Sequence, residues 1–415
     1  MPQVGHVRLQ RFPPETPPLT KAAVFKNLFM SNGTFFIVTD SRSDFPKVRL
    51  MASNPLTAYN TEENIAAREP TQYNMDFLSL AEAQRRWGGD VRNGQQNRVL
   101  SVDGNTVLVN EPRQFLRHYY HLVAELMQYT LGPHPAPPHI DRVIFARSNA
   151  DGWRDGPGFN AYFMRAAFPC GPRSSASHRG DVCGSQTQRI AAEAVVAMRS
   201  KKQLVGVRVG GWWEPVRSAV LRFAGVDLRP AENSDQVVLE SDTAEGDPRL
   251  PMPAKIVITY ISRQSAGQRK LTQESHEELV RELKDLVKRK GDKWEFLEVE
   301  AEKISKDEQL KIAARTTILL GVHGNGLTHL VMMQPTRVST VIEMFFPQGF
   351  AHDYQWTTNA LGMKHFAVWN DTFRTEGLGE GKPRVDYPDG FQGNAIPAHG
   401  PSIAKLIEDR VEGRV

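Results

Sequence analysis

KIVITYI at residues 255–261 and TILLGV at residues 317–322 are continuous apolar runs with the length of buried strands. Around them, strand-like and helix-like patterns alternate as far as residue 370. Strands that alternate with helices form a parallel sheet with helices on both faces. The sequence therefore predicts a Rossmann-like α/β domain over 251–370. Ligands of such a domain bind at the carboxyl ends of its strands.

Most of the expected elements of this domain have clear local signals. Leu279, Leu283 and Leu286 give one apolar stripe to a helix at 275–290, and Ser305-Lys-Asp-Glu308 is a capping box that begins a second helix. The remaining expected elements are strands at 294–299, 338–345 and 364–369 and helices at 326–333 and 352–361.

The first half of the chain is less regular. Its first twenty residues are Pro-rich, which predicts a disordered segment at 1–20. An acidic, Pro-containing stretch at 228–254 predicts a linker between two domains. Between these two segments we expect strands at 34–38, 99–102, 106–109 and 142–146 and helices at 114–130, 187–199 and 214–224.

Length and composition limit the class of protein. A chain of 415 residues, 40% apolar and 24% charged, is long enough for two globular domains. Its 51 basic and 47 acidic residues nearly balance, which argues against nucleic-acid binding through bulk charge. We see neither a membrane-spanning run nor a signal peptide. Cys170 and Cys183 could form one disulfide or remain free thiols.

Two strand ends of the predicted sheet carry groups suited to a phosphate. Arg263 and Arg269 lie in the loop after the first strand, and arginine binds phosphate through two donors. The turn GVHGNGLT at 321–328 precedes a helix, so its glycines allow close backbone approach and the helix start favours an anion. The candidate donor-binding residues of this turn are His323, Gly324, Asn325, Gly326 and Leu327.

A third strand end carries Glu343, within the apolar run VIEMFFP at 341–347. A carboxylate there is costly to bury unless it is satisfied, and a ribose diol would satisfy it. Taken singly, the arginines could be solvated, the glycine-rich bend only a turn, and Glu343 an exposed strand position. Three compatible turns of one sheet favour a nucleotide site.

A second constellation lies in HYYHLVAE at 118–125. His118, His121 and Glu125 share one helix face by their spacing. Such a face can hold a general base that deprotonates an acceptor hydroxyl, although helix-face histidines are often solvated or structural. We expect Glu125, or His121, to be this base, with Asp155 as the next candidate. The chain contains no Asp-x-Asp triplet, which favours neutralisation of a diphosphate by Arg, His and helix N-termini, with no metal.

These motifs resemble glycosyltransferase family 61 in ITYISRQ at 258–264 with Arg269, in GVHGNGLTHLVMM at 321–333, in VIEMFFP and in HYYH with Glu125. The resemblance implies an α/β fold of GT-B type, with two Rossmann-like domains facing a cleft. It implies inverting transfer of a sugar, such as GlcNAc or xylose, from a UDP-sugar to a hydroxyl of a glycan or glycoprotein. No cofactor and no metal would be needed.

Carried over by position, Arg263 and His323 would face the diphosphate, Gly324 and Gly326 would shape the loop, and Glu343 would lie near the ribose. The resemblance also implies the secretory pathway, in the Golgi or endoplasmic reticulum lumen, although the sequence shows no anchor. The alternatives are another nucleotide-binding α/β enzyme and a catalytically inactive relative that binds a glycan or a nucleotide sugar.

On this basis we expect an N-terminal, acceptor-side domain over 21–250 and a nucleotide-sugar-binding domain over 251–370. We expect the tail at 371–415 to pack back on the first domain. The expected partners are a nucleotide sugar and a glycan or glycoprotein acceptor, and no nucleic acid.

Overall fold

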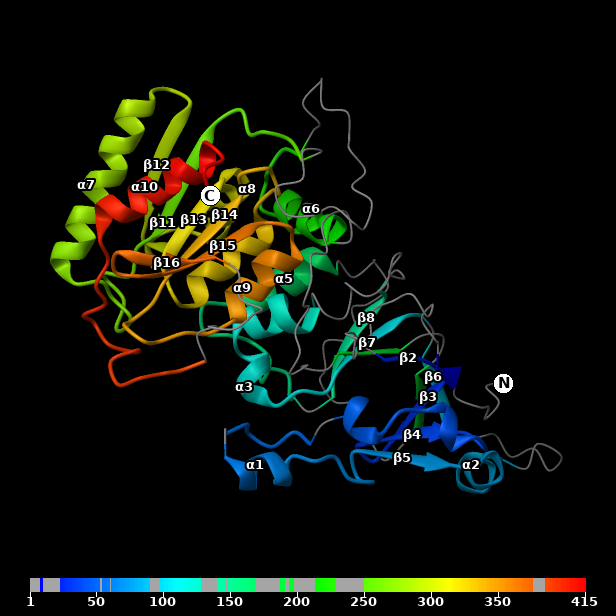
Figure 1. Ribbon diagram of the computed structural model, residues 1–415. Coiled ribbons are helices and arrows are strands. Elements are labelled where there is room, and N and C mark those ends of the chain that lie inside the picture. Colours follow the sequence, from blue (N-terminus) through cyan, green and yellow to red (C-terminus); the bar gives the residue numbers. More distant parts are fainter. Residues whose placement is uncertain are drawn as a thin grey trace. The chain divides into compact units, whose positions relative to one another are not determined.

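The computed structural model describes residues 8–9, 23–52, 54–59, 61–89, 98–102, 104–127, 140–146, 148–168, 187–190, 194–197, 213–228, 250–375 and 385–415. The chain divides into two compact units, Met1–Gln203 and Leu204–Val415 (Figure 1). Cys170, Cys183 and most of the segment 1–20 lie outside the described residues. Within the described ranges, no helix is long and apolar enough to span a bilayer.

The second unit is a doubly wound α/β domain. Its strand order is β12-β11-β13-β14-β15-β16, in which the first five strands are parallel and only β16 is antiparallel. The chain therefore fills the sheet outward from β11 in both directions, and the order reverses between β11 and β13. Such a switch point is where α/β sheets bind ligands. The strands are β11 (Ile256–Ile261), β12 (Trp294–Val299), β13 (Ile318–Val322), β14 (Thr340–Met344), β15 (Lys364–Trp369) and β16 (Thr372–Arg374).

Helices cover both faces of this sheet. α7 (Gln273–Lys290) and α10 (Gly400–Val411) lie side by side on one face, while α6, α8, η6 and α9 pack together on the other (Figure 1). The Rossmann-like domain predicted from the sequence is confirmed, and the Ser305–Glu308 capping box is formed. The other helices of this unit are α6 (Glu214–Phe223), η5 (Ala301–Lys303), α8 (Lys306–Arg315), the 3₁₀ helix η6 (Asn325–Met332) and α9 (Asp353–Ala360).

The observed start of the second unit differs from the boundary expected at 250/251. α6 belongs to this unit because it packs on α8 and η6. The indole Nε1 of Trp213, just before α6, also donates to the carbonyl of Val331 at 2.7 Å. Trp213 is 2% exposed, so this bond forms in a desolvated environment.

The end of the chain also differs from the expectation. The tail was expected to pack on the first domain, but α10 lies along α7 of its own unit. Ile403, Leu406 and Ile407 are buried in the same core as Leu279 and Leu283. Burial of these apolar side chains explains the position of the tail.

Among its described residues, the first unit contains two five-stranded sheets of mixed direction, in the orders β1-β2-β10-β7-β8 and β5-β4-β3-β9-β6. These sheets do not show a second Rossmann-like domain, so the two-domain GT-B assignment stays a prediction. The strands are β1 (Arg8–Leu9), β2 (Ala23–Lys26), β3 (Leu28–Ser31), β4 (Thr34–Val38), β5 (Met75–Leu78), β6 (Val99–Val102), β7 (Thr106–Val109), β8 (Arg142–Phe145), β9 (Thr187–Ile190) and β10 (Ala194–Ala197).

The helix expected at 187–199 is wrong, because β9 and β10 occupy residues 187–190 and 194–197 of this range. β9 pairs with β3 and β6, and β10 pairs with β2 and β7. Pairing on both sides outweighs a local helical pattern.

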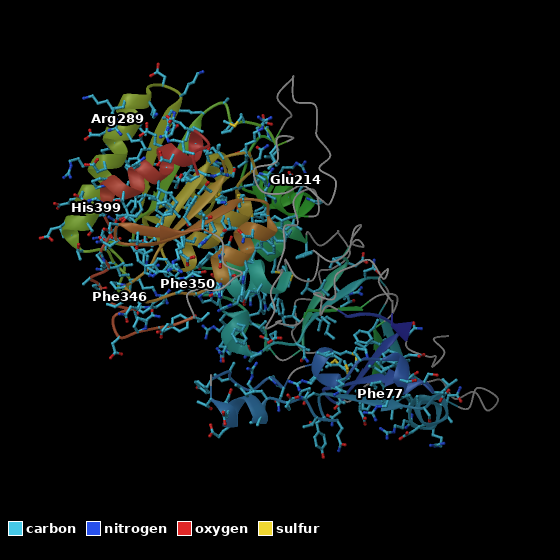
Figure 2. All side chains as sticks on the ribbon, viewed as in Figure 1. Phe77, Glu214, Arg289, Phe346, Phe350 and His399 are labelled. Atoms are coloured by element: carbon cyan, nitrogen blue, oxygen red, sulfur yellow. The ribbon has the colours of Figure 1, made fainter. Side chains whose placement is uncertain are left out.

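Short helices complete the first unit, and aromatic side chains fill its core. The rings of Phe29 and Phe36 lie 5.3 and 5.4 Å from the ring of Trp87. At the edge of this core the Arg42 guanidinium lies over the ring of Phe77, which is labelled in Figure 2. The helices are η1 (Arg42–Asp44), η2 (Val48–Leu50), α1 (Glu62–Ala67), α2 (Leu80–Trp87), α3 (Arg113–Leu116), the π-helix η4 (Tyr120–Met127) and α5 (Phe159–Ala167).

Candidate functional site

The first candidate group lies on η4, a π-helix. The single helix expected over 114–130 is interrupted, since α3 ends at Leu116 and η4 begins at Tyr120. π-helical segments are rare in proteins, and those that occur are often found at functional sites. His121 Nδ1 and Glu125 Oε2 are hydrogen-bonded, four residues apart. Glu125 is 1% exposed and the His121 side chain 19%, so the histidine is the member of the pair that solvent reaches.

Aromatic rings hold the His121 imidazole in place. The rings of Phe115 and Tyr120 lie 5.2 and 5.5 Å from it at steep angles, and the His118 ring lies at 4.5 Å. The His121–Glu125 contact supports the helix face predicted from the spacing. A carboxylate that accepts from Nδ1–H makes Nε2 the basic nitrogen of a neutral imidazole. This geometry can therefore take up a proton at His121, with Glu125 as the orienting group.

Asp155, the next candidate base, has another role. Its two carboxylate oxygens accept from the backbone N–H groups of Phe159 at 3.1 Å and Asn160 at 2.8 Å, at the start of α5. It is 7% exposed. These bonds satisfy donors that a helix N-terminus leaves open, so Asp155 stabilises the start of α5 with both of its oxygens.

The second candidate group lies at the switch point of the second unit. The loop after β11 brings Arg263 and Arg269 to Gly324, in the loop after β13. A Cβ atom on Gly324 would lie 3.2 Å from Arg263 Nη1 and 3.5 Å from Arg269 Nη1. Arg263 donates from Nη2 to the carbonyl of Gln268 at 3.1 Å, and Arg269 donates from Nη1 to the carbonyl of His323 at 3.3 Å. Two guanidinium groups thus converge on a backbone position that has no side chain.

The electrostatics of this position favour an anion. Burial, followed by the charge of nearby Arg269, lowers the pKa of Arg263 from its usual value. Arginine nevertheless remains charged at any relevant pH. An anion between the two side chains would relieve their repulsion and accept charge-assisted hydrogen bonds from both.

A buried carboxylate lies between two histidines next to the arginines. Glu343 Oε1 is 2.5 Å from His323 Nδ1, and Glu343 Oε2 is 2.7 Å from His365 Nε2. These residues come from β14, the end of β13 and β15. Burial raises the pKa of Glu343 to about 7, while the bond to His365 opposes this shift. The carboxyl group of Glu343 therefore titrates near neutral pH.

This arrangement does not fit the ribose contact expected of Glu343. Glu343 is 0% exposed, and each of its oxygens already binds an imidazole. A ribose diol could reach it only by displacing a histidine. Glu343 instead orients His323, whose ring also stacks on Phe345 with centroids 5.5 Å apart.

The remaining residues of the turn have distinct roles. A Cβ on Gly326 would lie 2.8 Å from Ile261 Cγ2, so this glycine allows η6 to approach the end of β11. Leu327 is 1% exposed, and its side chain belongs to the core rather than to a ligand contact. Asn325 Oδ1 accepts from Thr328 Oγ1 at 3.1 Å and braces the first turn of η6.

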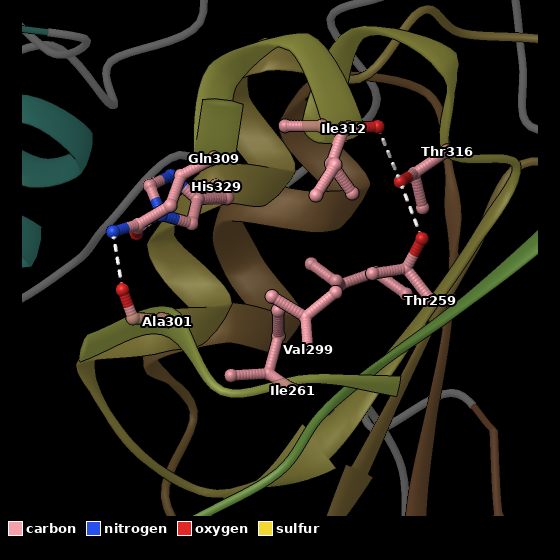
Figure 3. A pocket seen from close by; sticks show the side chains of 10 residues that line it. Thr259, Ile261, Val299, Ala301, Gln309, Ile312, Thr316 and His329 are labelled. Carbon is pink, nitrogen blue, oxygen red and sulfur yellow. Dashed lines mark hydrogen bonds between the residues drawn. The ribbon is translucent and has the colours of Figure 1, made fainter. Parts of the chain in front are cut away.

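A small cavity in the same unit lies elsewhere. It is enclosed between α8 and the sheet, with Ile261, Val299 and Ile312 among its walls (Figure 3). It has room for about one water molecule, so it is not a nucleotide site. In the part of the chain that the structure describes, no cluster of three or more His, Cys, Asp or Glu side chains could hold a metal ion.

Comparison with known proteins identifies the family. The Glycosyltransferase 61 family model matches residues 75–342, well over half of the 415 residues. The chain belongs to glycosyltransferase family 61. The match includes the His121–Glu125 pair and both switch-point loops, and it ends one residue before Glu343. The resemblance seen in the sequence motifs is thereby confirmed.

A relative in this comparison is the EGF domain-specific O-linked N-acetylglucosamine transferase of Drosophila melanogaster. The two sequences are 36% identical over 86 residues, which are 21% of this chain and 15% of that protein. The match thus covers less than a sixth of the relative's length. Membership of family 61 supports a transferase, whereas the donor and acceptor are not fixed by it.

Two glycines of the turn allow a test of this candidate anion site. Gly326→Ala should lower the free energy of unfolding by about 1–3 kcal/mol, because its Cβ overlaps Ile261 in a packed region. Gly324→Ala should change it by less than about 0.5 kcal/mol but weaken pyrophosphate binding, since its Cβ meets only the flexible ends of two arginines. Urea unfolding and calorimetric titration measure both. If both variants were as stable as wild type and bound pyrophosphate equally well, the roles given to these two glycines would be wrong.

The buried carboxylate predicts a pH dependence of stability. The pKa of Glu343 is raised from 4.5 to about 7 in the fold, so the native state binds its proton more tightly than the unfolded state. Its contribution to the free energy of unfolding is therefore complete below pH 4.5 and is lost as the pH rises to about 7. Wild type should therefore lose stability relative to Glu343→Gln across this window. Urea unfolding from pH 4.5 to 8 measures the difference, and a pH-independent difference would contradict the shift.

Proposed function

We propose that this protein transfers a sugar from a UDP-sugar to a hydroxyl of a glycan or glycoprotein, with inversion at the sugar carbon and without a metal. The observation that carries the donor half of the proposal is the convergence of Arg263 and Arg269 on Gly324 at the switch point. A diphosphate carries the charge that these side chains attract, and it is the leaving group of a nucleotide sugar. Family membership supports glycosyl transfer in general.

In this proposal the diphosphate lies against the turn at 323–326. Arg263 and Arg269 donate to its oxygens, and the backbone N–H groups at the start of η6 add to the positive potential. Preorganised donors of this kind stabilise the charge that develops on the leaving group as the glycosidic bond to the diphosphate breaks. They supply the neutralisation that a divalent cation supplies in other transferases.

The nucleophile in this proposal is the acceptor hydroxyl. His121 Nε2 takes its proton while the hydroxyl oxygen attacks the sugar carbon, and Glu125 stabilises the imidazolium through Nδ1. Attack on the face opposite the departing diphosphate inverts the sugar carbon. The expectation from the sequence named both residues, and the contrast in exposure favours His121 as the base.

The name of the Drosophila relative suggests a first donor to test, UDP-N-acetylglucosamine. The same family resemblance supports the secretory pathway as the proposed location of the reaction. A catalytically inactive relative would bind UDP and show no turnover with any donor. Another nucleotide-binding enzyme would prefer a nucleotide other than UDP. A panel of nucleotide sugars, scored for binding and for release of UDP, separates these alternatives.

Arg263→Ala should weaken UDP binding roughly ten- to a hundredfold, because a charge-assisted contact to phosphate is lost. Titration calorimetry with EDTA present measures the affinity. Arg281→Ala is the matched control, since that side chain is 59% exposed on α7 and lies away from the switch point. Unchanged affinity in Arg263→Ala, or UDP binding to wild type that strictly requires Mn²⁺, would overturn the donor site as proposed.

His121→Ala should slow turnover roughly 10²- to 10⁴-fold, as expected when a general base is removed. Its UDP affinity should stay close to that of wild type, because the diphosphate contacts belong to the second unit. Glu125→Gln should slow turnover less, since the imidazole itself remains. His276→Ala, on α7, is the control. Near-normal turnover in both His121→Ala and Glu125→Gln would show that the base lies elsewhere.

A further inference from the structure

The segment at 385–399, the C-terminal strap, crosses the carboxyl edge of the sheet in the second unit. At one end, Phe350 and Asp386 exchange backbone hydrogen bonds at 3.0 and 3.1 Å. Further along, Lys270 N–H donates to the carbonyl of Gly393 at 3.2 Å, and Ile396 N–H donates to the carbonyl of Lys270 at 3.0 Å. The strap therefore fastens the loop after β14 to the loop that carries both switch-point arginines.

Glycines make room for the strap at this edge. A Cβ on Gly349 would lie 2.4 Å from the ring of Phe391, and a Cβ on Gly390 would lie 2.6 Å from the ring of Phe346. Figure 2 labels Phe346 and Phe350, the two phenylalanines of the β14 loop that meet the strap. Because even a methyl group at either glycine would overlap a ring, the strap is packed closely against the β14 loop.

Two consecutive strap residues contact the donor site. The ring of Phe391 is 3% exposed and lies 5.3 Å from the ring of His323. Gln392 Oε1 accepts from Arg269 Nε at 2.5 Å. Nη1 of Arg269 donates to the carbonyl of His323, so the guanidinium plane is held at two of its edges.

The backbone of Arg269 shows that its position is imposed. Its φ is +57°, a left-handed conformation that a side chain with a Cβ rarely adopts. Strain of this kind persists only where the surroundings fix the residue. Here the next residue, Lys270, pairs with the strap on both its backbone groups, and the Arg269 side chain pairs with Gln392.

We propose that Gln392 is a positioning residue of the donor site, which holds Arg269 in the orientation that receives the diphosphate of the nucleotide sugar. This inference rests on the proposed function. Gln392 acts through Arg269 and does not itself touch the ligand. The strap lies beyond residue 342, where the family match ends, so the site is completed by a part of the chain that the family comparison does not reach.

A double-mutant cycle tests the proposal with UDP as the probe. Arg269→Ala should weaken UDP binding roughly ten- to a hundredfold, and Gln392→Ala about two- to tenfold. The double variant should bind UDP no more weakly than Arg269→Ala, because Gln392 has no effect once Arg269 is gone. If the strap had only a structural role, the losses of UDP affinity in the two single variants would multiply in the double variant. Gln273→Ala is the matched control, since Gln273 is an exposed glutamine of α7 bonded to Glu277.

The outcomes distinguish a failure of the proposed donor site from a failure of the role of Gln392. If Arg269→Ala binds UDP as wild type does, the donor site as proposed fails. If Arg269→Ala weakens binding while Gln392→Ala does not, or if the two losses multiply, the donor site stands and the role of Gln392 is refuted. Thermal unfolding of each variant shows whether a loss of affinity comes from unfolding, and Gln392→Asn, which keeps the amide, should lose less affinity than Gln392→Ala.

Discussion

The buried carboxylate of Glu343 fixes the geometry on which the switch-point site depends. It bonds His323 after β13 and His365 in β15 from its own place in β14, so one side chain connects three neighbouring strands. Burying a carboxyl group at this depth is costly unless both of its oxygens have hydrogen-bond partners. Both oxygens are satisfied here, and the imidazole of His323 is consequently held where the backbone turns toward Gly324.

The positive charge of the site is arranged around that fixed turn. Arg263 and Arg269 reach Gly324 from a different loop, and Gly324 leaves the space that a side chain would fill. Gly326 permits the helix start to lie against Ile261, which brings backbone donors to the same place. The strap then holds Arg269 from the opposite end of the chain. The proposed anion site would thus depend on close packing as much as on charge.

Much of the second unit could be predicted from the sequence because its signals are local. Apolar runs, the stripe of Leu279, Leu283 and Leu286, and the capping box at Ser305 each act within a few residues. The same holds for the two loops with Arg263 and His323, which follow strands directly. Strands β9 and β10 could not be found in this way, since their pairing partners are remote in sequence.

The roles of Glu343, Leu327 and Gln392 also depend on remote partners. The apolar run around Glu343 indicated a buried carboxylate, but nothing local indicated that two histidines satisfy it. Leu327 lies in the predicted turn, yet its side chain points into the core. Gln392 carries no motif, and only its distance to Arg269 reveals it. A polar residue next to a buried aromatic, as in Phe391-Gln392, is too common a pattern to predict such a contact.

The histidine–carboxylate pairs His323–Glu343 and His121–Glu125 belong to the two candidate groups, and their surroundings argue for different roles. His323 lies beside Arg269, which donates to its backbone carbonyl, and its imidazole shares the carboxyl group of Glu343 with His365. That environment suits a fixed hydrogen-bonding group beside an anion. At His121 the described ring neighbours are Phe115, His118 and Tyr120, and the carboxylate of Glu125 is bonded to Nδ1. In the proposed reaction, the carboxylate of Glu125 would stabilise a proton taken up at Nε2 of His121, as a general base requires.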